Sequence, residues 1–217
     1  DILRMSSDPK ANVMIGELSR TGQSRQPEAA WDHDLQPTAA LVPFGILDVS
    51  GGRLTIMFGT SCETSDGIAD GLELWWETNP PRFGHLRVLV IQADNSPHLK
   101  RPRTPFLRRM TELADNTGVN IRLVYYPPCH RKYNPIERCW GILETHWNGT
   151  LLRSIETAVN WAGSMTWKGL KPVVHVLKKV YRKGVKVSQD MMKDIEKRIK
   201  RSTNLPKWDV TIEPIVG

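Results

Sequence analysis

The sequence has no long apolar run. Hydrophobic residues make up 40% of its 217 residues, but no stretch approaches the roughly 20 consecutive apolar residues of a membrane-spanning helix. The chain opens on no signal peptide with an apolar core, and it contains no internal repeat or low-complexity tract. These absences favour a soluble, cytoplasmic protein without membrane attachment. The length suits one substantial core, since domains usually run to roughly 100 to 200 residues.

Cysteine is scarce as well. Cys62, Cys129 and Cys139 are odd in number and widely spaced, which excludes a disulfide scaffold and a paired zinc site. Cys129 is followed by His130, with Cys139 nine residues after it, but no fourth zinc ligand accompanies them. We therefore expect ordinary reduced thiols.

Acidic residues are sparse and scattered, whereas basic residues are clustered. The formal net charge is +7, and the basic residues gather in LKRPRTPFLRR (99–109), CHRK (129–132), LKKVYRKGVK (177–186) and KDIEKRIKR (193–201). Charge gathered in a few places favours a nucleic-acid partner over general solubility. For the basic amphipathic helix expected from about Ser188 to Lys200, a solvated face and a DNA or partner surface remain equally open.

The first half of the chain reads as antiparallel strands. Residues 2–7 form a strand that stops at Asp8-Pro9, and residues 12–19 are expected to be its hairpin partner. Residues 20–40 are polar, aperiodic and rich in turn formers, so they indicate a loop excursion. The next two apolar runs, 41–49 and 53–60, are joined by Ser50-Gly51-Gly52, which is a clear hairpin signal.

Helices and strands then alternate. The spacing predicts a helix capped by Thr64 or Ser65, a buried strand at 85–93, a helix at 104–118, a buried strand at 119–126 and a helix at 135–147, in that order. Residues 154–200 read as further helices, and the tail KWDVTIEP favours a short strand. This order predicts an α/β fold whose later strands are parallel and covered by helices on both faces. The chain opens on Asp1 directly before a strand, so we take it to be a piece of a longer protein.

Two aspartates stand where strands are expected to end. Asp94 follows the buried strand in ADNSPH, and strand ends of open α/β sheets are where ligands bind. Asp8 ends the first strand, before Pro9. If those strands are neighbours, the two carboxylates lie about 5 Å apart and repel unless a cation separates them. Taken alone, Asp94 is equally consistent with a turn residue, and Asp8 fits a turn residue better than a ligand.

Glu137 lies at the start of an expected helix. Asn134-Pro135-Ile136-Glu137 places Asn at the N-cap, Pro at N1 and an acid at N3, and each choice favours a helix start without any catalytic role. The preceding loop nevertheless carries His130, Arg131 and Lys132, which suit phosphate. A carboxylate beside a basic loop and two strand-end aspartates can also complete an oxygen-rich magnesium site.

These blocks resemble a known family. ADNSPH and YPPCHRKYNPIERCW resemble the second-aspartate and glutamate blocks of DDE transposases in the mariner-related insertion-sequence group. The run from SSDPKANVMIGELSR through WDHDL, VPFGILDV, LELWW and LADNTGVNIRL is more specifically similar to the Rhodopirellula-type transposases, in the same order over nearly the whole chain. Only the catalytic domain of that family is represented.

The resemblance implies a fold and a set of acids. It implies a ribonuclease H-like α/β fold, with a five-stranded mixed sheet flanked by helices and extra C-terminal helices. It divides the chain into a catalytic core at 1–150, with a loop insertion at 20–40, and a helical extension at 151–217. The family's catalytic, metal-binding acids correspond to Asp8, Asp94 and Glu137. Asp48 also lies on a strand, but GILDVSGGRLTIMFG matches a hairpin where the family has no catalytic acid.

The resemblance also implies a chemistry and partners. The three carboxylates would hold two Mg²⁺ or Mn²⁺ ions that cut phosphodiester bonds at transposon ends and support strand transfer into target DNA. The DNA would meet a basic and polar set of side chains, namely Asn95, His98, Lys100, Arg101, Arg103, His130, Arg131 and Lys132. A homo-oligomer on DNA is expected. His98 is equally consistent with a loop histidine of no special role.

Two other functions compete. A non-catalytic or domesticated DNA-binding remnant would keep the fold and the basic surface, although loss of an acid would favour it and all three are present. Another ribonuclease H-like nuclease, such as a junction resolvase, would share the acids but not the transposase blocks. Four tryptophans are spaced for helix packing, which favours the core over base stacking, namely Trp75, Trp76, Trp140 and Trp147.

Overall fold

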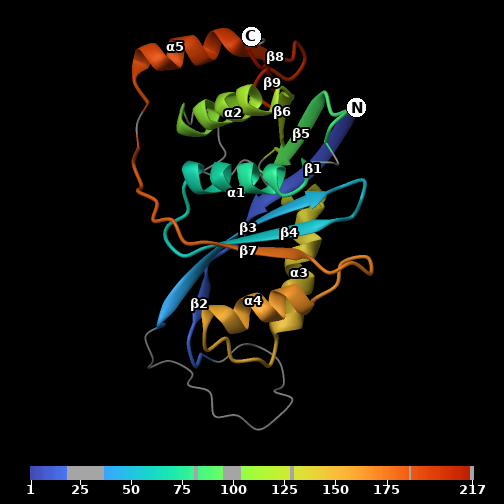
Figure 1. Cartoon of the computed structure of the whole chain (residues 1–217), viewed down its shortest axis with the longest axis vertical. Coiled ribbons are helices and arrows are strands. Elements are labelled where there is room, and N and C mark those ends of the chain that lie inside the picture. The colour runs from blue at the N-terminus through green and yellow to red at the C-terminus, as the bar shows by residue number, and fades with distance from the viewer. Residues whose placement is uncertain (19–36, 81–82, 95–103, 128–129, 186, 216–217) are drawn as a thin grey trace.

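One mixed β-sheet organises the molecule. A computed structural model describes residues 1–18, 37–80, 83–94, 104–127, 130–185 and 187–215. The strands follow one another across the sheet in the order β7-β4-β3-β1-β5-β6-β9-β8, with β2 paired to β3 (Figure 1). Their bounds are β1 Ile2–Pro9, β2 Val13–Ile15, β3 Ala39–Asp48, β4 Leu54–Gly59, β5 Val88–Ala93, β6 Asn120–Tyr125, β7 Val173–Leu177, β8 Ile199–Arg201 and β9 Asp209–Ile212.

Strand directions follow the expected plan. β1 runs antiparallel to β3 and parallel to β5, and β5 runs parallel to β6. The predicted hairpin is present as β3 and β4, and β7 adds a parallel strand beyond β4. Because β4 is antiparallel to β3, and β3 is antiparallel to β1, the strands β1, β4, β5, β6 and β7 all point the same way. Their carboxyl ends therefore meet at one edge of the sheet.

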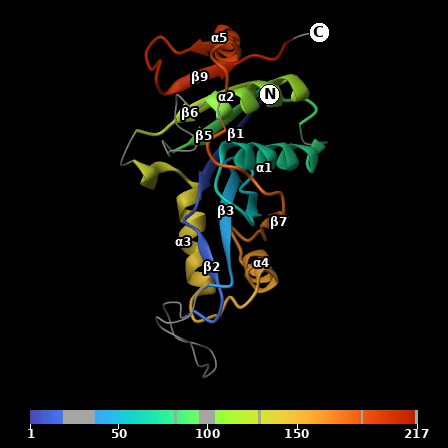
Figure 2. The ribbon, with the colours of Figure 1, turned by 90° about the vertical axis from the view of Figure 1, so that its left-hand side faces the viewer.

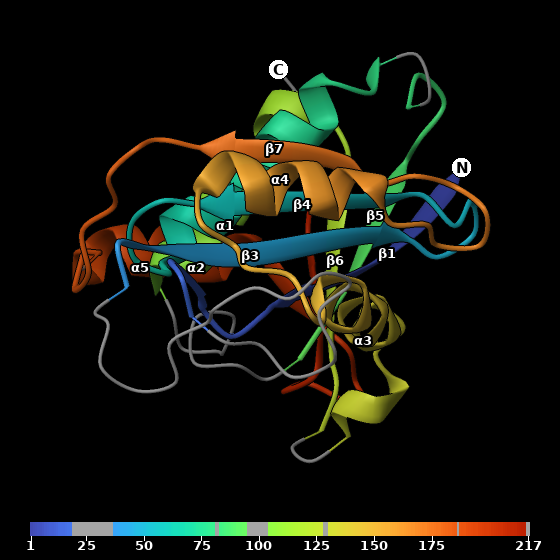
Figure 3. The same ribbon diagram turned by 90° about the horizontal axis from the view of Figure 1, so that it is seen from below.

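Helices cover both faces of this sheet. α1 (Ser65–Glu77), α2 (Thr104–Thr117) and α5 (Gln189–Arg198) pack on one face, around Met5, Ile46 and Ile91. α3 (Ile136–Trp147) and α4 (Ile155–Ser164) pack on the other face, around Leu47, Ile56 and Phe58. Figure 3 views the molecule from the end where α3 and α4 lie. No helix in the described part of the chain has the length and apolarity that a bilayer crossing requires.

Local sequence signals account for most helix starts. Thr64 caps α1 by accepting a hydrogen bond from the Gly67 amide at 3.1 Å, which settles the choice between Thr64 and Ser65. Ser154 and Ser188 cap α4 and α5 in the same way. The expected tryptophan packing is also confirmed, because Trp75, Trp140 and Trp147 are buried in the two cores, and Trp76 is partly buried and stacks on Phe83.

Three expectations about local structure were wrong. The segment at 13–15 pairs with β3 and not with β1, because β3 is long enough to take β1 on one half and β2 on the other. Residues 173–177 and 199–201 are strands where helices were expected; both are short runs that gain their hydrogen bonds from a neighbouring strand. The short C-terminal strand is confirmed as β9. Most of the expected excursion at 20–40 lies outside the described residues.

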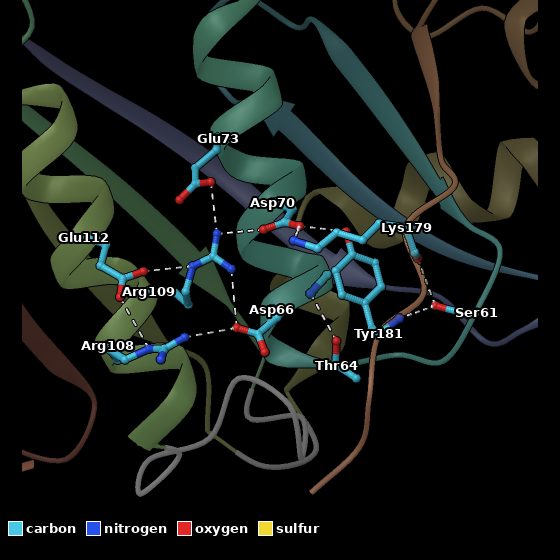
Figure 4. Close-up of polar contacts among 11 residues, drawn as sticks. Ser61, Thr64, Asp66, Asp70, Glu73, Arg108, Arg109, Glu112, Lys179 and Tyr181 are labelled. Carbon is cyan, nitrogen blue, oxygen red and sulfur yellow. Dashed lines mark hydrogen bonds and ion pairs between the residues drawn. The ribbon is translucent and has the colours of Figure 1, made fainter. Parts of the chain in front are cut away.

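A buried arginine joins α1 to α2. The Arg109 guanidinium contacts Asp66, Asp70 and Glu73 at 3.3, 2.7 and 2.9 Å (Figure 4). Those acids recur at helical spacing on α1, so one cation on α2 neutralises a whole stripe of α1. Burial opposes the charge of Arg109, but its hydrogen bonds to Glu73 and Asp70 hold its pKa above the ordinary value. The network therefore fixes how the two helices pack.

The same network predicts how stability depends on pH. Burial raises the pKa of Asp70, but hydrogen bonds from Lys179, Arg109 and Tyr181 outweigh burial, so this pKa lies below its ordinary value of 3.8. An acid with a lowered folded pKa stabilises the protein above its unfolded pKa and loses that contribution as pH falls. We expect the urea midpoint to fall as the pH drops below about 4, and to fall less steeply in Asp70→Asn. A midpoint that is unchanged or higher at pH 3 would contradict this.

The basic charges on and after α5 are mostly paired. Lys193 and Lys197 contact Asp190 and Asp194 one turn away at 3.1 and 2.8 Å. Arg198 reaches Asp115 on α2 at 2.5 Å, which attaches α5 to α2. Two further pairs follow the helix, Lys200 with Glu213 and Arg201 with Glu196. This end of the chain is therefore close to balanced in charge.

Candidate active site

Asp8 and Asp94 lie side by side at the carboxyl edge of the sheet. β1 and β5 are parallel neighbours, and their last paired residues are Ser7 and Ala93. Asp8 and Asp94 each come one residue later, on strands that are about 4.8 Å apart in such sheets. Both are buried, with 3% and 4% of their surface exposed. The condition for bringing the two aspartates together, that their strands are neighbours, is therefore met.

The side-chain alternation of β1 points Asp8 toward α3. Met5 belongs to the core under α1 and α2, whereas Ser6 hydrogen-bonds to the start of α3. Because successive side chains of a strand alternate between faces, Ser7 faces α1 and Asp8 faces α3. The same alternation, continued past Ala93, places Asp94 on the face of Asp8.

Gly45 brings α3 close to Asp8. In the β1–β3 pairing, Gly45 is the direct partner of Asp8, so both belong to the α3 face. A Cβ atom at Gly45 would lie 2.5 Å from Cδ1 of Ile136 and 2.6 Å from Cζ2 of Trp140. Only a residue without a side chain allows the first turns of α3 to lie this near the sheet. The close approach is directly beside Asp8.

A buried asparagine ties the start of α3 to β1. Asn134 is 0% exposed; its Oδ1 accepts a hydrogen bond from Ser6 Oγ, and its Nδ2 donates to the Ser7 carbonyl at 3.4 Å. The Ile136 amide donates to Ser6 Oγ at 3.0 Å. These bonds hold the first turn of α3 against the two residues that precede Asp8.

This arrangement corrects the expected helix cap. Asn134 was predicted to cap α3 with its side chain, but Pro135 is the N-cap and makes no side-chain capping bond. The amide group of Asn134 is used for Ser6 and Ser7 instead. Proline has no backbone N–H, so Glu137 cannot complete a capping box by bonding back to the cap residue. The capping explanation of Glu137 is thereby weakened.

Glu137 lies in the first turn of α3, which hydrogen bonds hold against the end of β1. It is partly buried, and its amide donates to the Asn134 carbonyl at 3.1 Å. Glu144, seven residues later on the same side of the helix, forms an ion pair with Lys10, two residues past Asp8. The start of α3 thus lies near Ser6, and Glu144 lies near Lys10.

Asp48 lies at the other edge of the sheet. It is the partner of Met5, three residues before Asp8, and its Oδ1 accepts hydrogen bonds from the amides of Ser50 and Gly51 at 3.0 and 2.8 Å. Its role is to stabilise the β3–β4 turn. The structure separates it from the strand ends that carry Asp8 and Asp94.

Part of the expected DNA-binding set lies directly before α3, whose first turn contacts the end of β1. His130 lies directly before η2 (Arg131–Tyr133), the short helix that carries Arg131 and Lys132 and precedes α3. Lys132 is exposed, with its Nζ 5.2 Å from the centre of the Tyr133 ring. The other expected residues, Asn95, His98, Lys100, Arg101 and Arg103, lie outside the described residues, as does Cys129. Cys62 and Cys139 are free thiols, as expected.

The donor chemistry fits a hard divalent cation. Asp8, Asp94 and Glu137 offer only carboxylate oxygens, which are the ligands that Mg²⁺ and Mn²⁺ prefer. Among the described residues, no three His, Cys, Asp or Glu side chains are already grouped to hold a metal ion. The fold brings together β1, β5 and α3, the elements that carry or precede the three acids.

Sequence reasoning missed the residues that position the acids. Ser6, Gly45 and Lys10 carry no motif of their own, and their contacts with α3 depend on a strand-to-helix packing that no local pattern reveals. Asn134 was visible in the NPIE block, but its position at a helix start favoured the wrong role. A polar serine within a buried strand was the one available signal, since such a group needs a partner.

The fold is similar to that of a solved transposase structure. The structure is similar to that of Mos1 transposase in a paired-end complex with the left transposon end, with a TM-score of 0.50, 10% sequence identity, and coverage of 74% of this chain and 46% of that chain. Aquifex aeolicus Argonaute aligns over 57% of this chain and 15% of its own, with a TM-score of 0.29 and 14% identity. The mixed sheet with helices on both faces confirms the expected ribonuclease H-like fold, but the sheet has nine strands where five were expected, because β2, β7, β8 and β9 add to it.

The family follows from the sequence. Residues 2–214 match the Rhodopirellula transposase DDE domain, and the chain belongs to that family. No curated protein matches the chain. The chain spans less than half the length of the Mos1 transposase chain that it resembles in structure.

Proposed function

We propose that this chain is the catalytic domain of an active DDE transposase, with Asp8, Asp94 and Glu137 as its catalytic and metal-binding acids. The observation that carries the proposal is the docking of α3 on β1. Hydrogen bonds between Ser6 and Ser7 on β1 and Asn134 and Ile136 at the start of α3 hold the first turn of α3 beside the strand ends that carry Asp8 and Asp94. A chain that kept only the fold would not require three acids at this one edge.

Each acid has a defined part in the proposal. Asp94 would be a ligand of both divalent cations, Asp8 of one or both, and Glu137 of the second. Bound ions would supply activation of a water or a DNA 3′-hydroxyl and stabilisation of the departing 3′-oxygen. Asn134 and Gly45 hold α3 where Glu137 can reach the aspartates. DNA phosphate oxygens complete the ligand shell, since Mg²⁺ sites are commonly finished by substrate phosphates.

The substrates of the proposal are transposon ends and target DNA. No side chain has to become a covalent nucleophile, so one site serves both hydrolysis at an element end and transesterification into a target. The basic segment at 130–132 directly before α3 supports a phosphate backbone reaching this edge. Assembly as a homo-oligomer on DNA is part of the same proposal.

Removal of divalent metal tests this function first. We expect the chain to nick or join duplex DNA that carries the element's ends with Mg²⁺ or Mn²⁺, to lose that activity fully in EDTA, and to regain it when the metal is returned. Denaturing gel electrophoresis of end-labelled DNA measures both products. Calcium is the matched control, because its larger and more flexible shell supports binding without the octahedral geometry of Mg²⁺. Cleavage that persists in EDTA would exclude the proposed chemistry.

A further inference from the structure

A second basic surface lies on the segment that follows β7. Residues 178–185, which we call the post-β7 segment, read KKVYRKGV and contain four cations and no acid. It leaves the sheet at the carboxyl end of β7, and β7 runs parallel to β4 and hence to β1 and β5. It therefore starts at the edge of the sheet where Asp8 and Asp94 lie. Figure 2 shows it passing α1 on its way to α5.

The backbone of the post-β7 segment is fastened to the loop after β4. The Thr60 amide donates to the Leu177 carbonyl at 3.2 Å, and Ser61 Oγ donates to the Lys179 carbonyl at 3.3 Å. The Tyr181 amide donates to Ser61 Oγ at 3.1 Å, and Cys62 Sγ donates to the Tyr181 carbonyl at 3.0 Å. The backbone is thus held at every second residue, at Leu177, Lys179 and Tyr181. A segment that is already fixed in this way loses little further backbone entropy when it binds a partner.

Its side chains divide into an inner and an outer set. Tyr181 is buried, with its hydroxyl 2.9 Å from Asp70, and the Lys179 ammonium is 2.7 Å from the same carboxylate (Figure 4). Lys178, Arg182 and Lys183 are exposed, and none of the three forms an ion pair with another described residue. Val180, between them, is 79% exposed. The inner set, Tyr181 and Lys179, is thus held by Asp70, although Lys179 stays exposed. The outer set, Lys178, Arg182 and Lys183, presents its cations to solvent.

The spacing of the outer cations suits a nucleic-acid backbone. Lys178 and Arg182 are four residues apart on extended chain, roughly 13 Å, and one strand of B-DNA passes about four phosphates over that length of its axis. Arg182 and Lys183 also line a cleft of about 290 Å³ with Thr104 and Pro105 of α2. Two acids line this cleft too, Glu63 and Asp66. Arg108 and Arg109 neutralise Asp66 at 3.6 and 3.3 Å.

We propose that the post-β7 segment binds the phosphate backbone of duplex DNA at the carboxyl edge of the sheet, three strands from β1, through Lys178, Arg182 and Lys183. The inference rests on the proposed function for the identity of the DNA, and it adds a binding surface that the acids and the loop at 130–132 do not supply. Its contacts are to phosphates, so they add affinity and position without reading sequence. α5 differs from the post-β7 segment in this respect, because the basic residues of α5 are paired with acids.

Two triple variants test this. One carries Lys178→Gln, Arg182→Gln and Lys183→Gln. The control carries Lys193→Gln, Lys197→Gln and Lys200→Gln, and it removes the same formal charge from residues that are paired with acids. Binding of a labelled 30-base-pair duplex is measured by fluorescence anisotropy over a range of salt concentrations in EDTA, and thermal unfolding is measured for each variant.

The expected result is weaker DNA binding in the first variant alone. Its slope of log K against log salt should shrink by about 0.9 for each phosphate that a removed cation neutralised, and its affinity at 0.1 M salt should fall ~8-fold per phosphate. The control should keep the wild-type slope. Equally weakened binding in both variants, an unchanged slope in the first, or no DNA binding by the wild-type chain would overturn the proposal. The binding assay runs in EDTA and therefore does not depend on catalysis. If the chain binds DNA here but cuts none in the assay with Mg²⁺ or Mn²⁺, the nuclease function is refuted and the DNA-binding role of the post-β7 segment still stands.

Discussion

Replacing any one of the three acids by its amide should abolish DNA cleavage and strand transfer. Asp8→Asn, Asp94→Asn and Glu137→Gln each keep the size of the side chain and remove the charge that a divalent cation needs. Metal catalysis of this kind supplies several kcal/mol of transition-state stabilisation, so we expect the rate to fall by at least ~1,000-fold. End-labelled DNA resolved on denaturing gels measures the rate under single-turnover conditions.

Asp48→Asn is the matched control for these variants. Asp48 is buried like Asp8 and lies on the strand paired to it, but it stabilises a turn at the far edge of the sheet. We expect this variant to keep its rate once its lower stability is allowed for, and all four variants to bind DNA in EDTA. Wild-type activity in Glu137→Gln would remove Glu137 from the site and leave it as an acid in the first turn of a helix.

Gly45→Val should displace α3 and cost both stability and activity. The new Cβ would lie 2.5 Å from Ile136 Cδ1 and 2.7 Å from Trp140 Cη2, and the Trp140 ring is 5% exposed, so it has little room to move. Overpacking of this kind costs about 1–3 kcal/mol. Because Glu137 lies in the displaced turn, the rate per folded molecule should fall as well. Urea unfolding and the cleavage assay, run together, separate the two effects.

Gly141→Ala on the same helix is the control for Gly45. A Cβ at Gly141 meets nothing within 4 Å, and alanine is favoured over glycine in a helix interior by about 1 kcal/mol. This variant should be as stable as the wild type or more so, and equally active. If Gly45→Val is also as active as the wild type per folded molecule, the close docking of α3 does not position Glu137.

Much of the edge that carries Asp8 and Asp94 was predictable from local patterns. The run RVLVIQAD predicts a buried strand that ends at an acid, and ILRMSSDP predicts a strand that ends at another; both strands are present, and they are parallel neighbours. The helix that carries Glu137 was equally clear from the stripe of Ile136, Trp140, Leu143 and Trp147. Periodicity and turn residues are properties of neighbouring residues, so they can be read from a single sequence without knowing which elements pack together.

The pairing of elements across the chain was less predictable. β2 was assigned to β1 because hairpins are the commonest link between successive strands, but the long strand β3 supplies the edge that β2 uses. β7 reads as a short apolar run that suits a helix or a strand, and only the free edge of β4 decides between them. Asn134 was misjudged for the same reason, because its partners Ser6 and Ser7 are more than 120 residues away.

Localised oxidative cleavage tests the central claim most directly. Fe²⁺ replaces Mg²⁺ in many carboxylate sites, and with ascorbate and peroxide it generates hydroxyl radicals that cut the polypeptide beside the bound ion. On the DNA-bound chain we predict cuts near residues 8, 94 and 137 together, mapped by mass spectrometry, suppressed by excess Mg²⁺ and absent in Glu137→Gln. Cuts at only one of these positions, or only elsewhere in the chain, would show that the three acids do not share a metal site.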